Sequence, residues 1–237
     1  MLTTGFFKNS SGIDVAKWAF SNRLDGKSAP PFDSLNLATH VGDSSIAVAF
    51  NRSAALEEFG YKDATWPGPV HGTDIGMVEK TSGLFPDVDG LITKRRTAVL
   101  ATMGADCASL IAVDVENKIA LTAHIGWKGA ANEIHLSIIQ AIEESGGNLK
   151  NVRIVLGPAI CGNCYKVDTD RIEQVSKILP AARCDLGIDI RLGLQAIFRP
   201  LVQSVELVGD CTFESADLFS HRRDGKTGRQ AGFVVLL

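Results

Sequence analysis

Hydrophobic positions recur with the period of an α-helix in several parts of the chain. Residues 46–59 follow a capping sequence, Asp-Ser-Ser, and Gly60 comes directly after them as a stop signal. Between Ile134 and Ser145, apolar residues recur three or four positions apart, and two glycines follow. These patterns predict helices over 46–59 and 134–145. Similar patterns predict further helices within 168–179 and 186–204.

Short runs of Val, Ile, Leu, Ala and Thr form a second pattern, which is typical of buried strands. Three such runs follow one another at 97–103, 108–115 and 118–125. A tight Glu-Asn connection joins the last two, which predicts an antiparallel hairpin. Later runs predict further strands at 153–157, 205–209 and 232–237. Because strands and helices alternate irregularly, we expect a mixed β-sheet in an α+β fold, a layered α/β sandwich.

The first third of the chain is rich in Gly, Pro, Asp, Asn and Ser, which predicts loops there. There is no internal repeat, charge block or long linker in the sequence, so we expect one domain over 1–237. Neither of the glycine-rich phosphate patterns, GxGxxG or GxxxxGK[ST], occurs.

Composition narrows the classes of protein. The chain has 237 residues, 45% of them hydrophobic and 22% charged, as expected of a folded protein. Its net charge of -3 argues against nucleic acid as the main partner. The N-terminus has no secretory leader, and no apolar run is long enough to span a membrane. An odd number of cysteines, five, favours reduced thiols. We therefore expect a cytoplasmic protein without a membrane or nucleic-acid partner, and no pattern indicates its oligomeric state.

Three metal-binding residue types occur where local packing does not require them. They are His71 in PVHGTD, Cys107 in GADCASL and His124 in TAHIGWKG. Cys107 lies between two predicted strands, and His124 ends the next, so neighbouring strand ends would bring both together. One thiolate and two imidazoles suit zinc or copper, and three ligands with an open position are typical of catalytic zinc. The alternative is a buried thiol with two ordinary histidines, since the spacing matches no short zinc motif.

Other polar residues have two interpretations each. Asp106 precedes Cys107 and can act as a general acid or base, or orient a ligand by a hydrogen bond. Cys161-Gly-Asn-Cys164 is a single C-x-x-C, which without a second pair is a weak zinc or redox motif and otherwise a loop. Cys184 and Cys211 have no patterned partners.

The segment 221–230 is strongly basic and contains an Asp-Gly turn signal. It forms either a solvated hairpin or a clamp in which arginine guanidinium groups hold phosphate. Its basic residues are Arg222, Arg223, Lys226 and Arg229.

Six ordered blocks of the sequence resemble the bacterial YfiH-type family. Its members are called laccase-domain protein, polyphenol oxidase, purine nucleoside phosphorylase or peptidoglycan editing factor. The similarity begins at SNRLDGK and runs to the C-terminus. The blocks are VHGTDI, DGLIT, ADCASLIAVD, AHIGWKG, LGPAICGNCYKVD and CTFESADLFSHRRDGKTGR.

The resemblance implies a YfiH-like fold and a zinc ion bound by His71, Cys107 and His124. It implies that Arg222 and Arg223 clamp phosphate. Asn36 and Arg52 lie in family-like blocks and can reach a substrate, or serve as a cap and a surface residue. The chain departs from the family pattern without losing a metal ligand, at Pro69, Ser109, Lys128, Lys166 and His221.

The leading hypothesis is therefore a zinc-dependent purine nucleoside phosphorylase. Its substrates would be phosphate and adenosine, inosine, guanosine or methylthioadenosine. Adenosine deamination would occur beside phosphorolysis, because zinc can activate water at neutral pH. The usual deaminase signature, H-x-E with P-C-x-x-C, is absent.

Three alternatives stay open. A copper-dependent polyphenol oxidase needs a further three-copper cluster, yet only His40, His135 and His221 remain. We would then ascribe copper binding in vitro to the metal's high intrinsic affinity. A hydrolase that edits UDP-muramoyl amino acids in peptidoglycan synthesis would use the same zinc chemistry. A non-catalytic, zinc-stabilised binding module would unfold on metal removal.

Overall fold

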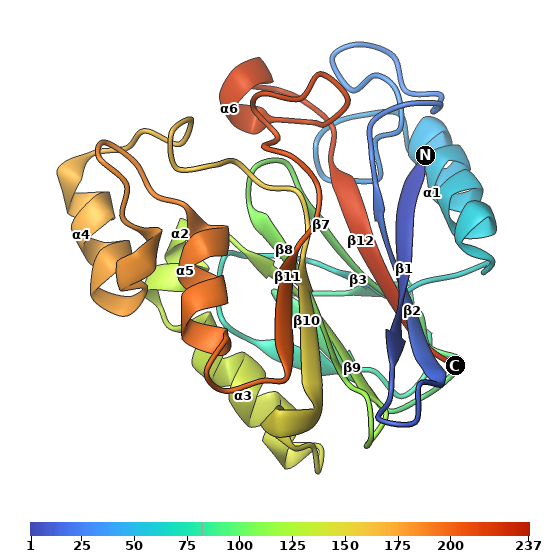
Figure 1. The fold of residues 1–237 in the computed structure, drawn as a ribbon. Coiled ribbons are helices and arrows are strands. Elements are labelled where there is room, and N and C mark those ends of the chain that lie inside the picture. The colour runs from blue at the N-terminus through green and yellow to red at the C-terminus, as the bar shows by residue number, and fades with distance from the viewer. Residues whose placement is uncertain (82) are drawn as a thin grey trace.

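The computed structural model describes residues 1–81 and 83–237, which form four layers (Figure 1). Two β-sheets pack face to face, and helices cover both outer faces. The four-stranded sheet has the order β1 (Leu2–Lys8), β2 (Asp14–Ser21), β12 (Gln230–Leu236), β7 (Leu100–Gly104). The six-stranded sheet has the order β11 (Ser204–Leu207), β10 (Val152–Leu156), β8 (Ala108–Asp114), β9 (Ile119–Ile125), β6 (Gly90–Thr93), β4 (Ile75–Met77). A small sheet pairs β3 (Trp66–Pro67) with β5 (Leu84–Phe85).

Helices occupy the two outer layers. One side of the sandwich is covered by α1 (Ser45–Phe59). The other side carries α2 (Trp127–Ala131), α3 (Ile134–Glu144), α4 (Thr169–Ile178) and α5 (Ile190–Phe198). The short α6 (His221–Asp224) lies above the sheets in Figure 1. Two 3-10 turns are at Leu149–Asn151 and Pro180–Ala182.

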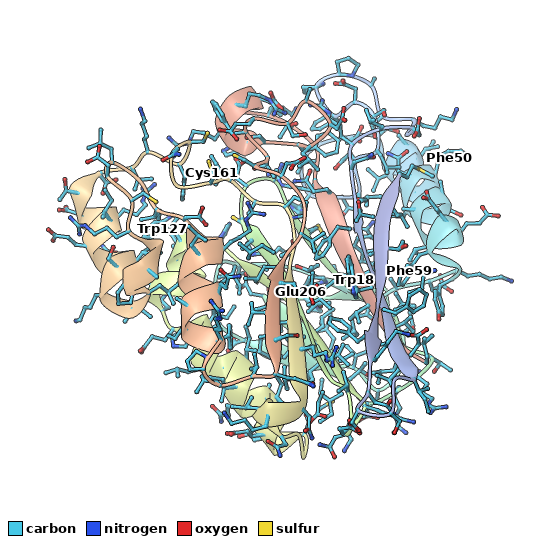
Figure 2. All side chains as sticks on the ribbon, in the orientation of Figure 1. Trp18, Phe50, Phe59, Trp127, Cys161 and Glu206 are labelled. Atoms are coloured by element: carbon cyan, nitrogen blue, oxygen red, sulfur yellow. The ribbon has the colours of Figure 1, made fainter. Side chains whose placement is uncertain are left out.

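Three hydrophobic cores follow from the alternation of side chains along the strands. In β8, Leu110 packs against the helices, whereas the next residue, Ile111, packs between the two sheets. Trp18 also lies between the sheets (Figure 2). On the far side, Phe59 of α1 contacts Phe233 of β12, with ring centroids 5.7 Å apart. The central strands β7, β12, β8 and β9 are therefore buried on both faces.

The strongest local signals are confirmed. The Ser44 hydroxyl accepts the Ala47 amide at the start of α1, and Gly60 ends the helix with φ 97°. The 118–125 run pairs antiparallel with the 108–115 run as β8 and β9. Asp114 explains their tight connection, because its carboxylate accepts the amides of Glu116 and Asn117. The sheet is mixed, as expected, since β10 pairs parallel with β11 and antiparallel with β8.

The turn-rich sequence between β2 and α1 forms loops, as predicted, but the two strands before it were not predicted. β1 and β2 form an antiparallel pair at the edge of the four-stranded sheet. Thr3 and Thr4 of β1 are exposed, so this edge strand lacks the apolar pattern that marked the buried strands. The basic segment also differs from a hairpin, because residues 221–224 form the helical turn α6, whose N-cap is Ser220.

Several strand ends meet at one end of the sandwich. Ala108 of β8 pairs with Ile125 of β9, and Gly90 of β6 pairs with Ala123. In the other sheet, the end of β7 pairs with the start of β12, Gly104 with Gln230. The loops that leave these strands therefore form a common rim. Among the described residues, the longest helix, α1, has 15 residues, and no helix combines the length and hydrophobicity of a membrane span.

Candidate active site

His71, Cys107 and His124 lie together at this rim. The three potential ligand atoms are all within 4.8 Å of one another. His124 is the penultimate residue of β9 and pairs with Ser109 of β8, two residues after Cys107. The two imidazole rings meet edge to face, with centroids 4.9 Å apart. The pairing of neighbouring strands thus brings the three side chains together, as the sequence predicts.

Asp89 holds both histidines in place. Its carboxylate accepts the backbone amides of Val70, His71 and Gly72, at 3.1, 3.0 and 2.6 Å. It also accepts a hydrogen bond from Nδ1 of His124 at 2.9 Å. Since Nδ1 faces this carboxylate, Nε2 of His124 is the nitrogen that is left for a metal. A carboxylate behind a histidine is the usual second partner of a metal ligand.

The charges of these groups are coupled. Burial by itself would raise the pKa of Asp89, but the hydrogen bonds from His124 and the Gly72 amide lower it. Burial would lower the pKa of His124, but negative charge on Cys107 and the hydrogen bond to Asp89 raise it to about 9. Burial and the neighbouring His124 lower the pKa of His71. The buried carboxylate of Asp89 therefore lies against the ring of His124 and the backbone amide of His71.

Close backbone packing at the site depends on a glycine. A Cβ atom at Gly126 would lie 2.7 Å from Nδ1 of His71 and 3.1 Å from Sγ of Cys107. His71 itself has a left-handed backbone, with φ 59°, a conformation that is uncommon outside glycine. The Asp89 carboxylate accepts the amide of His71 and the amides on either side of it in this conformation. The glycine-containing turn after β9 therefore leaves room for the His/Cys/His cluster.

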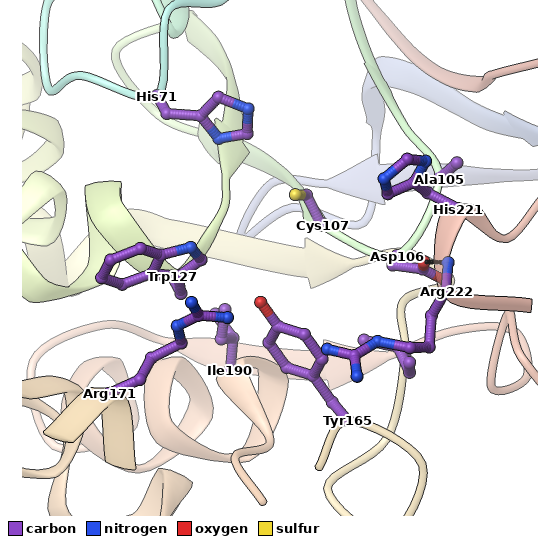
Figure 3. A pocket seen from close by; sticks show the side chains of 11 residues that line it. His71, Ala105, Asp106, Cys107, Trp127, Tyr165, Arg171, Ile190, His221 and Arg222 are labelled. Atoms are coloured by element: carbon purple, nitrogen blue, oxygen red, sulfur yellow. Dashed lines mark hydrogen bonds between the residues drawn. The ribbon is translucent and has the colours of Figure 1, made fainter. Parts of the chain in front are cut away.

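A large cavity opens on one side of the cluster (Figure 3). Its volume is about 460 Å³, within the range of roughly 300–1,000 Å³ that is usual for small-molecule sites. A guanidinium lies over each of two aromatic rings: Arg171 over Trp127 at 4.5 Å from the centroid, and Arg222 over Tyr165 at 5.0 Å. The lining residues are His71, Ala105, Asp106, Cys107, Trp127, Ile160, Tyr165, Arg171, Ile190, His221 and Arg222.

A smaller cavity of about 310 Å³ lies on the other side. It shares His71, Ala105, Cys107 and His221 with the large cavity. Its cation is Arg229, which precedes β12; one guanidinium nitrogen, Nη1, donates to the carbonyls of Thr227 and Gly228. The lining residues are His40, Pro69, His71, Met103, Gly104, Ala105, Cys107, His124, His221 and Arg229. The cluster thus faces two compartments.

A hydrogen bond defines the tautomer of His221, which lines both cavities. Its Nδ1 lies 2.6 Å from the carbonyl oxygen of Gly225. A carbonyl can only accept, so Nδ1 carries a proton and the neutral ring has its lone pair on Nε2.

Asp106 contacts α6 rather than the histidines. Its carboxylate accepts the hydroxyls of Thr212 and Ser220, both at 2.7 Å, and the amide of Arg222 at 2.6 Å. These bonds hold α6 and the Thr212 loop against the cavity, which Asp106 also lines. Asp89, rather than Asp106, makes the side-chain hydrogen bond to the metal-ligand candidate His124.

The two neighbouring arginines lie in different surroundings. Arg222 lines the large cavity, and its Nη1 donates to the Lys166 carbonyl. Arg223 lines neither cavity. Its guanidinium is bonded to the side chain of Asp224 and to main-chain carbonyls. Those carbonyls belong to Thr212, Phe213, Ser215 and Leu218. The structure therefore does not form the expected phosphate clamp from this pair.

Asn36 and Arg52 lie behind the site. Asn36 is fully buried and bonds to Ala38 and Asp43 and to the amide of Arg229. Arg52 lies over the ring of Trp66, and burial lowers its pKa to about 10. Neither side chain lines the two cavities.

Sequence reasoning missed Asp89 and the position of Arg229 in the wall of the smaller cavity. Asp89 belongs to the block DGLIT, directly before a buried strand, and that position was the only signal available. Arg229 was one of several basic residues, and only the β7–β12 pairing places it beside the cluster.

The donor set fits zinc. One sulfur and two imidazole nitrogens are ligands that zinc prefers, and a set of three leaves a position for water or substrate. A three-copper cluster lacks its ligands, since the whole sequence holds only five histidines and His135 is on α3.

The fold and the site define a laccase-domain protein, a layered α+β sandwich with a His/Cys/His cluster at the rim of its sheets. The family model described as multi-copper polyphenol oxidoreductase laccase matches residues 17–237. The chain belongs to this family, the YfiH-type laccase-domain family.

Relatives and solved structures agree with this assignment. A Streptomyces coelicolor protein named purine nucleoside phosphorylase is 35% identical, over 94% of this chain and 97% of its own. YlmD of Bacillus subtilis, with the same name, is 31% identical over 91% and 86%. Among crystal structures, YfiH of Bacillus licheniformis has a TM-score of 0.85 at 29% identity, covering 94% of this chain and 93% of its own. A Neisseria meningitidis protein has a TM-score of 0.84 at 27% identity, covering 99% and 98%.

Proposed function

We propose that the protein is a zinc-dependent purine nucleoside phosphorylase. The observation that carries the proposal is the position of the His/Cys/His cluster between two cavities that share His71 and Cys107. Phosphorolysis breaks the bond between the purine and C1′ of the ribose and forms a bond from a phosphate oxygen to C1′. Two reactants must therefore meet at one carbon, in an orientation that the protein sets.

The large cavity is the proposed nucleoside site. Trp127 and Tyr165 supply aromatic surface, and Ile190 supplies apolar surface. Arg171 and Arg222 add hydrogen-bond donors beside the rings. Such a lining, mostly apolar with a few polar groups, suits a purine with an attached sugar.

The smaller cavity is the proposed phosphate site. Arg229 lines it, and among the described residues its Nε and Nη2 atoms make no hydrogen bond, which leaves donors for an anion. Burial lowers the pKa of Arg229, although Cys107 and Asp106 oppose the shift. A planar guanidinium can bind two phosphate oxygens at once. We assign phosphate binding to Arg229, with Arg222 at the boundary of the nucleoside site, and we leave Arg223 out.

The metal ligands in this proposal are His71, Cys107 and His124. Zinc held by them would supply Lewis-acid chemistry and activation of water. Adenosine deamination belongs to the same proposal, with adenosine, inosine, guanosine and methylthioadenosine as nucleosides. Asp106 is the candidate acid or base on the nucleoside side. The five free cysteines favour a cytoplasmic enzyme.

The test is product analysis with metal-defined protein. Inosine with phosphate should give hypoxanthine and ribose 1-phosphate, and adenosine without phosphate should give inosine. Both activities should be lost in Cys107→Ala and kept in Cys184→Ala, a matched control since Cys184 lies outside the His/Cys/His cluster. Release of an amino acid from a UDP-muramoyl substrate, with inosine left intact, would overturn the proposal in favour of peptidoglycan editing. No turnover of any substrate would favour a binding module.

A further inference from the structure

A second group of metal-binding side chains lies in the loops beside the nucleoside site. Cys161 and Cys164 belong to the loop between β10 and α4, and Cys161 is labelled in Figure 2. Cys211 and Glu214 belong to the loop between β11 and α6. Their four ligand atoms all lie within 4.8 Å of one another. Tetrahedral zinc with Zn–S bonds of about 2.3 Å places its sulfur ligands about 3.8 Å apart, so the observed separation is close to that of a metal site.

The backbone prepares this arrangement. Each pair of residues is separated by two positions and spans a turn: the Cys161 carbonyl accepts the Cys164 amide at 3.1 Å, and the Cys211 carbonyl accepts the Ser215 amide at 3.0 Å. The two turns contact each other, because the Cys161 amide donates to Sγ of Cys211 at 3.3 Å. A hydrogen bond from a neighbouring amide to the sulfur is one of the contacts that orient a metal ligand.

Other contacts connect the group to its surroundings. Residues Ala159 and Cys211 form an isolated parallel bridge, which fixes one loop against the other. Sγ of Cys164 donates to Oε1 of Glu214 at 3.3 Å; a metal ion would replace that proton. Cys211 is buried and Glu214 is exposed, so the group opens to solvent on its carboxylate side, where an ion can enter.

We propose that Cys161, Cys164, Cys211 and Glu214 bind a second zinc ion, in a structural site. Three thiolates and one carboxylate complete a tetrahedral set, which closes the site to substrate. The sequence alone showed a single C-x-x-C, and the tertiary structure supplies the missing pair. This inference does not depend on the nucleoside reaction.

Such an ion would stabilise the nucleoside site from outside. Ile160 and Tyr165, the residues that flank the first loop pair, both line the large cavity. Thr212, next to Cys211, donates its hydroxyl to Asp106. An ion bound by both loops would therefore hold the ring of Tyr165 in place and, through Thr212 and Asp106, the helical turn α6.

The decisive test uses Cys107→Ala, which removes the only sulfur of the His/Cys/His cluster and leaves the second group intact. We expect about two zinc ions per wild-type chain and about one in Cys107→Ala. After substitution with cobalt, Cys107→Ala should keep the intense thiolate-to-cobalt absorption of a three-thiolate site. Adding Cys164→Ser should remove most of it, whereas adding Cys184→Ser, the matched control, should leave it unchanged.

Three results would overturn the proposal. The first is a folded Cys107→Ala protein that binds no zinc and shows no thiolate-to-cobalt absorption. The second is an equal loss of absorption in the Cys184→Ser control, which would place the ion elsewhere. The third is mass-spectrometric detection of a Cys161–Cys164 disulfide in wild-type protein prepared with zinc under reducing conditions. The first and third of these results do not require a variant of the second group to fold.

Discussion

Asp89→Asn tests the carboxylate on which the cluster depends. Asp89 is 1% exposed, and its two oxygens accept four hydrogen bonds. Asparagine has the same shape but offers one acceptor oxygen and one amino group. Whichever way the amide turns, its amino group faces two N–H donors that had shared one carboxylate oxygen. Two N–H donors then lose their acceptor, or only one where the His124 ring changes tautomer and accepts the amino group; the three amide hydrogen bonds are part-buried.

The magnitude follows from this count. A buried donor without an acceptor costs about 1–3 kcal/mol; because the amide hydrogen bonds are part-buried, we expect Asp89→Asn to lower the free energy of unfolding by about 1–3 kcal/mol in total. For a chain of this size each kcal/mol corresponds to roughly 2–4 °C in Tm. Loss of the carboxylate behind His124 should weaken zinc binding by about 10- to 100-fold. Both effects have the same origin, because Asp89 holds the backbone at His71 and the ring of His124.

Thermal unfolding of the metal-free protein measures the first effect, and competition with a chromophoric chelator measures the second. The control is Asp87→Asn, at an exposed position with φ 56°, a conformation that asparagine tolerates. If Asp89→Asn matches this control in both Tm and zinc affinity, the assigned role of Asp89 is refuted.

Four further predictions concern the cavities, α6 and the metal. Arg223→Lys should lower the unfolding free energy by about 1–3 kcal/mol in thermal melts, because lysine cannot reach all the carbonyls that arginine binds; an unchanged Tm would contradict this. Arg229→Lys should raise the KM for phosphate on the order of 10-fold or more and change the KM for inosine less. Trp127→Ala should raise the KM for inosine more than the KM for phosphate. Equal changes of the two KM values in both variants would contradict the two-cavity assignment. Removal of metal from the His/Cys/His cluster should abolish turnover but leave the circular dichroism spectrum folded, since the three cores are large.

Several features of the fold could be predicted because their causes are local. α1 has its cap at Ser44 and its stop at Gly60, within a residue of both ends. The β8–β9 hairpin depends on Asp114 and the two amides that follow it. The edge strand β1 could not be predicted, because its exposed residues carry no apolar period. Local sequence patterns indicate periodicity, caps and turns. An edge strand such as β1 forms because it pairs with a neighbouring strand, here β2.

The residue types of the site, and the neighbouring strand ends that carry Cys107 and His124, could be read from the sequence. The polar side chains that contact them became known from the folded chain. Asp106 and Ser220 are 114 positions apart, and Cys161 and Cys211 are 50 apart, yet both pairs are in contact. Arg222 and Arg223 are adjacent in sequence, but one lines the large cavity and the other binds main-chain carbonyls. The physical reason is that a buried polar group must find its hydrogen-bond partner in three dimensions, and sequence spacing does not record where that partner lies.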